Sequence, residues 1–528
     1  MPRFLLIGLD GAEPSLIERW IADGLLPNLK RLRDLGGCSP CISTIPHATF
    51  PAWSTCVTGV NPGKHGVIDF TQQIPGEYAI RFVNASAREH PAIWNVLSEQ
   101  NKHSCVLGVP TTYPPEAING VLVSGFDSPV CTGIDSSFVH PPELYPKVKD
   151  WTFADFQETN IGPGWHAMAL EKLLQGVERK EGIALELYRQ EPWDFFMVVF
   201  GETDTVSHHF WMHHDPNSPR HVAEHQTAIQ QVYERLDVTV GEFLDASDAL
   251  DDVVVGVVSD HGFGGSGTGV VYLNNWLAQQ GHLQFVTQRD SWLKKLALTV
   301  VLDSWKGTIF RKFQGLASKA ESLSRFSGID FSQTLAWSEE LNYFPSIRVN
   351  LAGREPEGQV SPEDYEDFCR TLCAELETWE VIEKAWHRDE IYSGPYVDRA
   401  PDIVLELALD EGYSHSCLRS RGGKVFRRLE EHEHIGGKEK GMNGNHRQEG
   451  IFMLSKPFSI ESMSLLNVAP TVYDVLGVAA PELDGRSVLG GAVAERIRVS
   501  ENSAHDAVYT KEQEASVEAR LRDLGYFE

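Results

Sequence analysis

The sequence predicts an α/β fold in which a doubly wound, mostly parallel sheet lies between layers of helices. Three apolar runs without polar alternation, residues 4–9, 195–200 and 253–258, are typical of strands that are covered on both faces. Helical stretches such as 164–189 and 221–246 separate these runs, and this alternation favours a parallel sheet. In such folds the ligand site lies beyond the carboxyl ends of the strands, so we expect the site at that edge.

Length and composition indicate an ordinary folded protein with a strong negative charge. The chain has 528 residues, of which 42% are hydrophobic and 23% charged, so disorder and coiled coil are poor interpretations of the whole. The length allows about two to four domains, or one large α/β core with insertions. The formal charge of −28 disfavours a nucleic-acid duplex as the main partner, because phosphates are repelled unless a local positive site intervenes.

The sequence predicts a cytoplasmic protein. No run reaches about 18 consecutive apolar residues, so no membrane span is expected. The apolar part of the first segment is too short for a signal peptide, and we interpret it as a core strand. The eight cysteines lack the spacing of a disulfide framework, and Cys38 and Cys41 have no second pair at zinc-ribbon distance. The oligomeric state is open, with a homo-oligomer as one option.

We divide the chain into four segments. Residues 1–285 and 337–490 are predicted to form the first and second parts of the core, and 491–528 a peripheral C-terminal segment. The insertion 286–336 stands out by its charge, because residues 286–330 contain eight basic side chains against four acidic ones. It fits an amphipathic helical insertion packed on the core, a mobile lid that attracts an anionic substrate, or a helix on a membrane surface.

Carboxylates and imidazoles follow the predicted strands. A single acidic residue after a strand is a common cap or turn residue, but three strands that each deliver one favour a shared site. The spacing of Asp204 and His208 puts both on one face of a helix. Mixed donors of this kind suit Zn²⁺, with Mn²⁺ as the alternative, and six donors would serve two metal ions about 4 Å apart. The candidate ligands are Asp10, Asp204, His208, Asp260, His261 and His446.

Thr49 is the candidate nucleophile. Pro51 fits the first turn of a helix, which places Thr49 at the helix N-terminus, where N–H groups and the dipole favour anions. We also count Thr49 among the candidate metal ligands, because a hydroxyl bound there to a divalent cation can ionise near neutral pH, as metal-bound water does. The alternative interpretation is that Thr49 is a plain N-cap residue.

In this order the motifs resemble the alkaline phosphatase superfamily and, within it, the type I phosphodiesterase/nucleotide pyrophosphatase family. The matching segments are GLDGAEP at Asp10, PHATFPAWSTCVTGVNPGKHG at Thr49, ETDTVSH at Asp204, SDHGFG at Asp260 and GNHRQEG at His446. The resemblance implies an alkaline-phosphatase-like sheet with a helical lid insertion. It also implies that a small phosphate ester is the substrate.

The same resemblance implies a mechanism. Thr49 would attack phosphorus, form a covalent phospho-threonine and be released by water. The implied metal ligands are Asp204, His208 and His446 for one ion, and Asp10, Asp260 and His261 for the other.

The chain departs from the family at position 52, where the resemblance implies an Asn that helps hold a phosphoryl oxygen and this sequence has Ala52. A missing oxyanion donor costs on the order of 10²-fold in rate, so we expect a replacement or a different substrate. The candidate replacements are the N–H of Phe50 and the side chains of Lys64, His65, Asn445 and Arg447.

The leading functional prediction is a two-metal phosphoric ester hydrolase, specifically a phosphodiesterase. A phosphomonoesterase or a phosphonate or sulfate ester hydrolase of the same superfamily is an alternative, although the segment at Thr49 lacks the Cys/Ser-x-Pro-x-Arg motif of sulfatases. A non-catalytic or phosphotransferase relative that keeps the fold is a further alternative, because a fold alone does not give a function.

Overall fold

The structure is a computed structural model of the chain, and it describes residues 2–125, 136–151, 161–286, 326, 328–340, 344–435 and 442–491. Most of the predicted insertion 286–336 and nearly all of the segment 491–528 lie outside these residues. The interpretations offered for both segments, and the division of the chain at their boundaries, therefore stay predictions.

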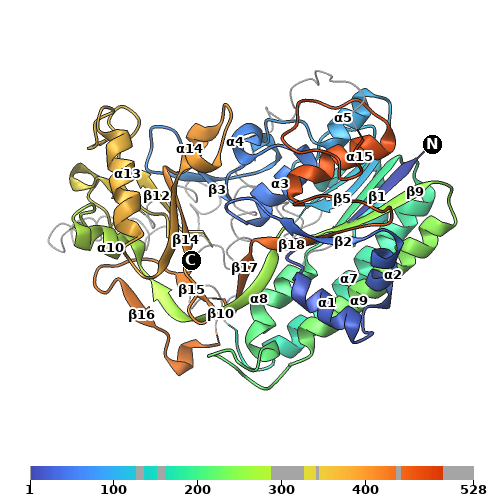
Figure 1. Cartoon of the computed structure of the whole chain (residues 1–528), viewed down its shortest axis with the longest axis horizontal. Coiled ribbons are helices and arrows are strands. Elements are labelled where there is room, and N and C mark those ends of the chain that lie inside the picture. The colour runs from blue at the N-terminus through green and yellow to red at the C-terminus, as the bar shows by residue number, and fades with distance from the viewer. Residues whose placement is uncertain are drawn as a thin grey trace, which may run out of the picture.

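A central eight-stranded sheet forms the framework, in the order β2-β18-β9-β1-β8-β5-β6-β7 (Figure 1). The strands β9, β1, β8, β5 and β6 run parallel, whereas β18 and β7 are antiparallel to their neighbours. This arrangement confirms the predicted doubly wound sheet, with an antiparallel strand towards each edge. The bounds are β1 (Arg3–Leu9), β2 (Cys38–Ile42), β5 (Ser104–Val109), β6 (Gly120–Ser124), β7 (Val139–His140), β8 (Phe195–Phe200), β9 (Val253–Val258) and β18 (Glu449–Leu454).

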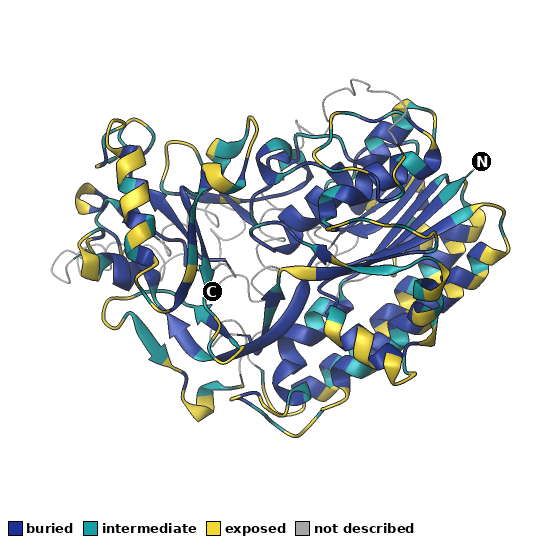
Figure 2. Cartoon of the chain, viewed as in Figure 1, coloured by how far each residue is buried: buried dark blue, intermediate teal, exposed yellow. Residues whose placement is uncertain are grey.

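Helices cover both faces of this sheet (Figure 1). One face carries α1 (Pro14–Ala22), α2 (Pro27–Leu35), α7 (Trp165–Gln190), α8 (Glu202–His214) and α9 (Ala228–Asp248). The other face carries α3 (Thr49–Thr58), α5 (Ile93–Glu99) and α15 (Val468–Leu476). Figure 2 shows the sheet buried between the two layers, with exposed residues on the outer sides of the helices.

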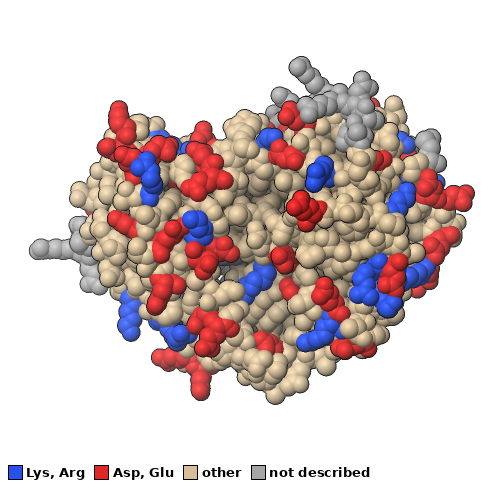
Figure 3. All heavy atoms as spheres, viewed as in Figure 1, with Lys and Arg blue, Asp and Glu red and all other residues tan. Residues whose placement is uncertain are grey.

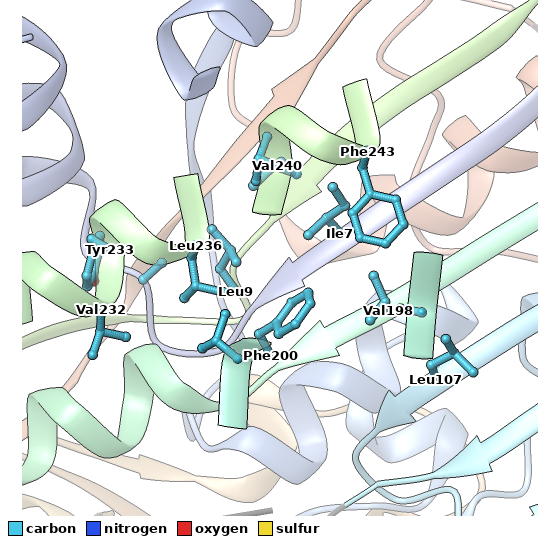
Figure 4. Packing of buried hydrophobic residues seen from close by; sticks show 14 of the residues in the cluster. Ile7, Leu9, Leu107, Val198, Phe200, Val232, Tyr233, Leu236, Val240 and Phe243 are labelled. Atoms are coloured by element: carbon cyan, nitrogen blue, oxygen red, sulfur yellow. The ribbon is translucent and has the colours of Figure 1, made fainter. Parts of the chain in front are cut away.

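The alternation of side chains along β1 builds two separate cores. Leu5 and Ile7 enter the core beneath α7 and α9, whereas Phe4 and Leu6 enter the core beneath α3 and α15. Figure 4 shows Ile7 packed near Phe243 of α9, with Val198 of β8 in the same cluster. Each such side chain contributes about 1.5–3 kcal/mol when it is fully buried, so the unbroken apolar runs of the sequence stabilise both layers.

The helix α9 begins later than predicted. The apolar pattern predicted a helix from residue 221, but α9 starts at Ala228. Residues 221–227 form turns instead, and His225 has a φ of 56°, which an α-helix cannot accommodate. The helix α7 agrees with the predicted range within one residue at each end.

A second assembly of strands and helices, here called the small lobe, lies beside the central sheet (Figure 1). It contains an antiparallel sheet of order β11-β12-β14-β13 and the strands β15, β10 and β16, with β17 paired to β10. The sequence did not predict this separate sheet. Its elements are β10 (Gly262–Val271), β11 (Ala336–Trp337), β12 (Ser346–Val349), β13 (Ile382–His387), β14 (Ile403–Leu407), β15 (Ser414–Cys417), β16 (Phe426–Arg428), β17 (Gly444–Arg447), α10 (Leu273–Gln280), α13 (Tyr365–Leu376) and α14 (Arg388–Ile391).

The remaining short elements are β3 (Thr71–Gln73), β4 (Ile80–Phe82), α4 (Pro62–His65) and α6 (Tyr145–Val148). Among the helices that the structure describes, none combines the length and the apolar character that crossing a membrane requires. The small lobe has its own apolar core around Leu273, Trp337 and Ile403. The long strand β10 starts two residues after Asp260 and continues into this lobe, so it joins the edge of the central sheet to the small lobe.

Candidate active site

The structure brings all six predicted ligand residues together at the carboxyl edge of the central sheet. Asp10 directly follows β1, and Asp260 and His261 lie two and three residues after the end of β9. Asp204 and His208 lie one turn apart on α8, as the spacing predicted, and His446 lies on β17. All of these side chains are buried except Asp204, which is 14% exposed.

Asp204 joins two imidazoles into a first cluster. The Nε2 atoms of His446 and His208 lie 3.2 Å and 3.4 Å from Asp204 Oδ1. The same two Nε2 atoms are 3.1 Å from each other. Three donor atoms therefore converge within a space that one divalent ion can occupy.

Asp10, Asp260 and His261 form a second cluster next to the first. His261 Nε2 lies 3.5 Å from Asp10 Oδ1 and 3.4 Å from Asp260 Oδ2. The ring of His261 stacks on the ring of His446, with 3.7 Å between their centroids. His261 consequently belongs to both compact donor groups, one with Asp10 and Asp260 and the other with Asp204 and His446.

Backbone carbonyls orient the three imidazoles. Each Nδ1 atom lies 3.0 Å from a carbonyl oxygen, which makes Nδ1 the protonated donor and leaves Nε2 as a lone-pair donor. The pairs are His208 with Gly444, His261 with Gly262, and His446 with His47. This is the arrangement that fixes histidine ligands at metal centres.

The three carboxylates are buried together without a protein cation. Among the residues that the structure describes, no Lys or Arg forms an ion pair with Asp10, Asp204 or Asp260. Asp10 Oδ1 and Asp260 Oδ2 are buried without a hydrogen bond, and both face His261. Such a cluster is costly unless a positive charge compensates it, so the donor set fits divalent metal ions.

The pKa shifts reflect the same arrangement. Burial, followed by the charges of the other two carboxylates, raises the pKa of Asp10 well above its usual value. Burial also raises the pKa of Asp260, with Asp204 adding to the effect. Burial alone would raise the pKa of Asp204 too, but His208 and His446 hold it well below its usual value. Burial lowers the pKa of His261 and His446, which favours the neutral form that binds a metal.

Thr49 is the first residue of α3, and two contacts tie the start of this helix to the clusters. The carbonyl of His47 accepts from His446 Nδ1, and Trp53 Nε1 donates to Asp10 Oδ2 over 3.1 Å. The N-cap residue is Ala48, so the interpretation of Thr49 as a plain N-cap is wrong. Thr49 is buried at the N-terminal end of α3, where the helix dipole favours negative charge.

Ala52 is completely buried, and its methyl group belongs to the apolar core on the α3 side of the sheet. His65 bonds Thr55 Oγ1 and accepts from the N–H of Val67, and these contacts make it a loop brace. Lys64 pairs with Asp484.

The two other candidates for the missing donor lie on β17. Asn445 Oδ1 accepts from the N–H of His446 over 2.9 Å. Arg447 reaches into the small lobe, where it donates to Ser414 Oγ over 2.5 Å and to the carbonyl of Gly412 over 3.2 Å. Both side chains line a pocket that also contains His446.

Several residues that hold the backbone of the candidate ligands in place were not predicted from the sequence. Thr203 donates to the carbonyl of Asp10, and Ser259 accepts from the N–H of Ala12 and donates to the carbonyl of His261. Gly11 has a φ of 64°, and a Cβ there would lie 3.2 Å from Asp204 Cα. The only signal in the sequence was the adjacency of these residues to the ligand motifs, which does not say what they contact.

The chain was compared with known proteins. The family model described as type I phosphodiesterase / nucleotide pyrophosphatase matches residues 4–432. Ectonucleotide pyrophosphatase/phosphodiesterase family member 3 of Mus musculus is 30% identical over 99 residues, which are 18% of this chain and 11% of that protein. The Bos taurus protein of the same description is 28% identical over 95 residues, with the same coverage. The matched stretch thus spans about a tenth of these relatives.

Two solved structures share the fold at low sequence identity. Phosphonoacetate hydrolase from Sinorhizobium meliloti 1021, in complex with phosphonoformate, is 15% identical, with a TM-score of 0.52 over 90% of this chain and 95% of that chain. Human ectonucleotide pyrophosphatase / phosphodiesterase 5 is 12% identical, with a TM-score of 0.50 over 92% of this chain and 97% of that chain.

Proposed function

The chain belongs to the type I phosphodiesterase / nucleotide pyrophosphatase family, and on that premise we propose that it is a two-metal phosphodiesterase with Thr49 as its nucleophile. The family match agrees with the resemblance drawn from the motifs. The observation that carries the proposal is the convergence of Asp10, Asp204 and Asp260 on three imidazoles whose Nε2 atoms face them. No Lys or Arg in the described part of the chain pairs with these three carboxylates. The N-terminus of α3 reaches this convergence through His47 and Trp53.

The residues divide into two ligand sets around His261 and His446. Asp204, His208 and His446 would hold one ion, and Asp10, Asp260 and His261 the other. When bound, two divalent cations polarise the phosphoryl oxygens, favour ionisation of a nearby hydroxyl and stabilise the departing oxygen. The mixture of imidazole and carboxylate donors favours Zn²⁺, with Mn²⁺ as the alternative, over the all-oxygen sites that suit Mg²⁺.

Thr49 carries the covalent step. Its hydroxyl loses a proton to solvent, and Oγ1 bonds to phosphorus while the bond from phosphorus to the leaving oxygen breaks. The leaving oxygen takes a proton from solvent and departs as an alcohol. A water molecule then attacks the phospho-threonine, releases a phosphate monoester and restores Thr49. The N-terminus of α3 favours the negative charge on the phosphoryl group through both steps.

Thr49→Ala tests this proposal. We expect hydrolysis of bis(p-nitrophenyl) phosphate to fall by at least about 10³-fold, because the covalent route is removed, while the metal content stays at two ions per chain. Thr371→Ala serves as the control, since Thr371 is an exposed threonine of α13. The metal content of each variant is measured by mass spectrometry. Full activity in Thr49→Ala would remove Thr49 from its role, and fewer than two bound ions in the wild type would remove the two-metal site.

A further inference from the structure

A pocket of about 380 Å³ lies beside the metal-ligand clusters, between β17 and other strands of the small lobe. His47 and His446 line its inner end, so the pocket begins where the ligand set of Asp204, His208 and His446 lies. Strands β13, β14 and β15 of the small lobe supply the opposite wall. Figure 3 shows the surface hollowed between the two lobes, with both acidic and basic side chains beside the hollow.

Two glutamates give the wall of the small lobe its charge. Glu383 and Glu406 come from the neighbouring strands β13 and β14, and both line the pocket. Neither carboxylate has an ion-pair partner among the residues that the structure describes. Burial, followed by the charge of Glu383, raises the pKa of Glu406, although the charge of Arg447 acts in the opposite direction. The two carboxylates are therefore close enough to repel each other, and a cation between them would relieve that repulsion.

Arg447 also lines the pocket, but its guanidinium is committed to the protein. It donates to Ser414 Oγ, to the carbonyl of Gly412 and to the carbonyl of Gly265 over 2.5, 3.2 and 3.2 Å. A further bond reaches the carbonyl of His446 over 3.1 Å. Arg447 thus ties β17 to neighbouring segments of the small lobe, and little of its hydrogen-bonding capacity remains for an anionic ligand.

The rest of the lining suits an organic group better than a phosphate. Phe344 packs edge-on against His47, with 3.8 Å between the ring centroids, and Leu409 is 51% exposed. His415 is buried in the same lining, and its Nδ1 has no hydrogen-bond partner among the described residues. The pocket therefore combines aromatic and aliphatic surface with two carboxylates and an imidazole that can bind a polar group.

We propose that this pocket receives the leaving alcohol of the substrate, and that Glu383 and Glu406 select an alcohol bearing an ammonium group over a pyrophosphate or a polyphosphate chain. The inference rests on the proposed function, because it assigns the departing group of the Thr49 reaction. A cationic alcohol gains attraction from both carboxylates, whereas a further phosphate is repelled by both of them. Arg447 carries one positive charge against these two negative ones, and its N–H groups are already bonded to the protein. In the Thr49 step this alcohol leaves protonated, and the other ester group stays on phosphorus.

Three matched diesters test the selection. They are 2-aminoethyl methyl phosphate, its isostere propyl methyl phosphate, and carboxymethyl methyl phosphate, and the product methyl phosphate is quantified by chromatography. In the wild type we expect kcat/KM to be about tenfold higher for the aminoethyl diester than for the propyl diester, with the carboxymethyl diester slowest. In the double variant Glu383→Gln/Glu406→Gln we expect the ratio of aminoethyl to propyl to fall close to one.

The control variant changes the net charge by the same amount, but at two positions outside the pocket. Glu363→Gln/Glu380→Gln removes two exposed carboxylates of the small lobe, and we expect it to keep the wild-type ratio. Equal kcat/KM for the aminoethyl and propyl diesters in the wild type would overturn the inference, as would an unchanged ratio in Glu383→Gln/Glu406→Gln. The proposed function fails separately, if none of the diesters is hydrolysed or if hydrolysis of the propyl diester survives Thr49→Ala.

Discussion

Two regions of this protein bury carboxylates, and they differ in whether a basic side chain pairs with the buried carboxylate. In the small lobe, Asp402 is completely buried, and Arg354 donates to both of its oxygens over 2.7 Å and 2.6 Å. The hydroxyl of Tyr365 and the N–H of Val349 complete its hydrogen bonds over 2.6 Å and 2.7 Å. At the edge of the central sheet, Asp10 and its neighbours are equally buried, yet no Lys or Arg among the described residues pairs with them.

The pKa shifts show what the difference means. Burial alone would raise the pKa of Asp402, but Arg354 holds it below its usual value, so the folded protein carries a stable ion pair there. Burial raises the pKa of Asp10 and Asp260 without such a partner. A buried carboxylate with its own arginine stabilises the fold, whereas buried carboxylates without a cation indicate a place where a cation is meant to bind.

The largest expected effect comes from Asp260→Asn at the edge of the central sheet. The amide keeps an oxygen for the N–H of Gly11, which bonds Asp260 Oδ1 over 3.1 Å, but it removes a charged ligand. We expect diesterase activity to fall by more than about 10²-fold with loss of bound metal. The metal-free protein should unfold at a higher temperature than metal-free wild type, because one unpaired buried charge is gone. A metal-free variant less stable than metal-free wild type would contradict the comparison.

Asp402→Asn in the small lobe should lower the stability of the protein and leave its metal binding unchanged. It removes one of the two carboxylates that pair with Arg354, while Glu355 stays in place. Breaking a buried ion pair costs up to about 3–5 kcal/mol of unfolding free energy. The metal content should stay at that of the wild type, because Asp402 contacts none of the six candidate ligands. Urea unfolding measures the loss, with Asp367→Asn as the control, since Asp367 pairs with Arg370 in solvent. If Asp402→Asn lost metal without losing stability, the contrast between a stabilising ion pair at Asp402 and a cation site at the sheet edge would be wrong.

The two regions also differ in how much of their structure could be predicted from the sequence. The strands of the central sheet and the six candidate ligands were predictable, because continuous apolar runs and the acidic residues behind them are local signals. The small antiparallel sheet was missed, since its strands are short and its pairing joins segments far apart in the chain. For the same reason the pairing of Asp402 with Arg354, and the position of Glu383 and Glu406 beside His446, could not be foreseen.

The smallest expected effect concerns Glu340, a buried carboxylate of the small lobe with hydrogen bonds but no arginine. It accepts from the N–H of Asn274 and the N–H of Ser420, both over 2.7 Å. Burial nevertheless raises its pKa from 4.5 to about 7. Because the folded pKa lies above the unfolded value, its contribution to stability is complete below pH 4.5 and is lost as the pH rises through 7.

Glu340→Gln isolates this contribution, because the amide keeps the shape of the side chain but does not titrate. Between pH 4.5 and pH 7.5 we expect the unfolding free energy of metal-free wild type to fall by up to about 3 kcal/mol more than that of the variant. Urea unfolding of both proteins in EDTA measures this double difference, in which the titration of all other groups cancels. Parallel pH curves would show that the hydrogen bonds from Asn274 and Ser420 replace an arginine at this position. The carboxylates at the sheet edge would then differ from the buried carboxylates of the small lobe, because their charge is compensated by a bound cation or a proton and not by hydrogen bonds.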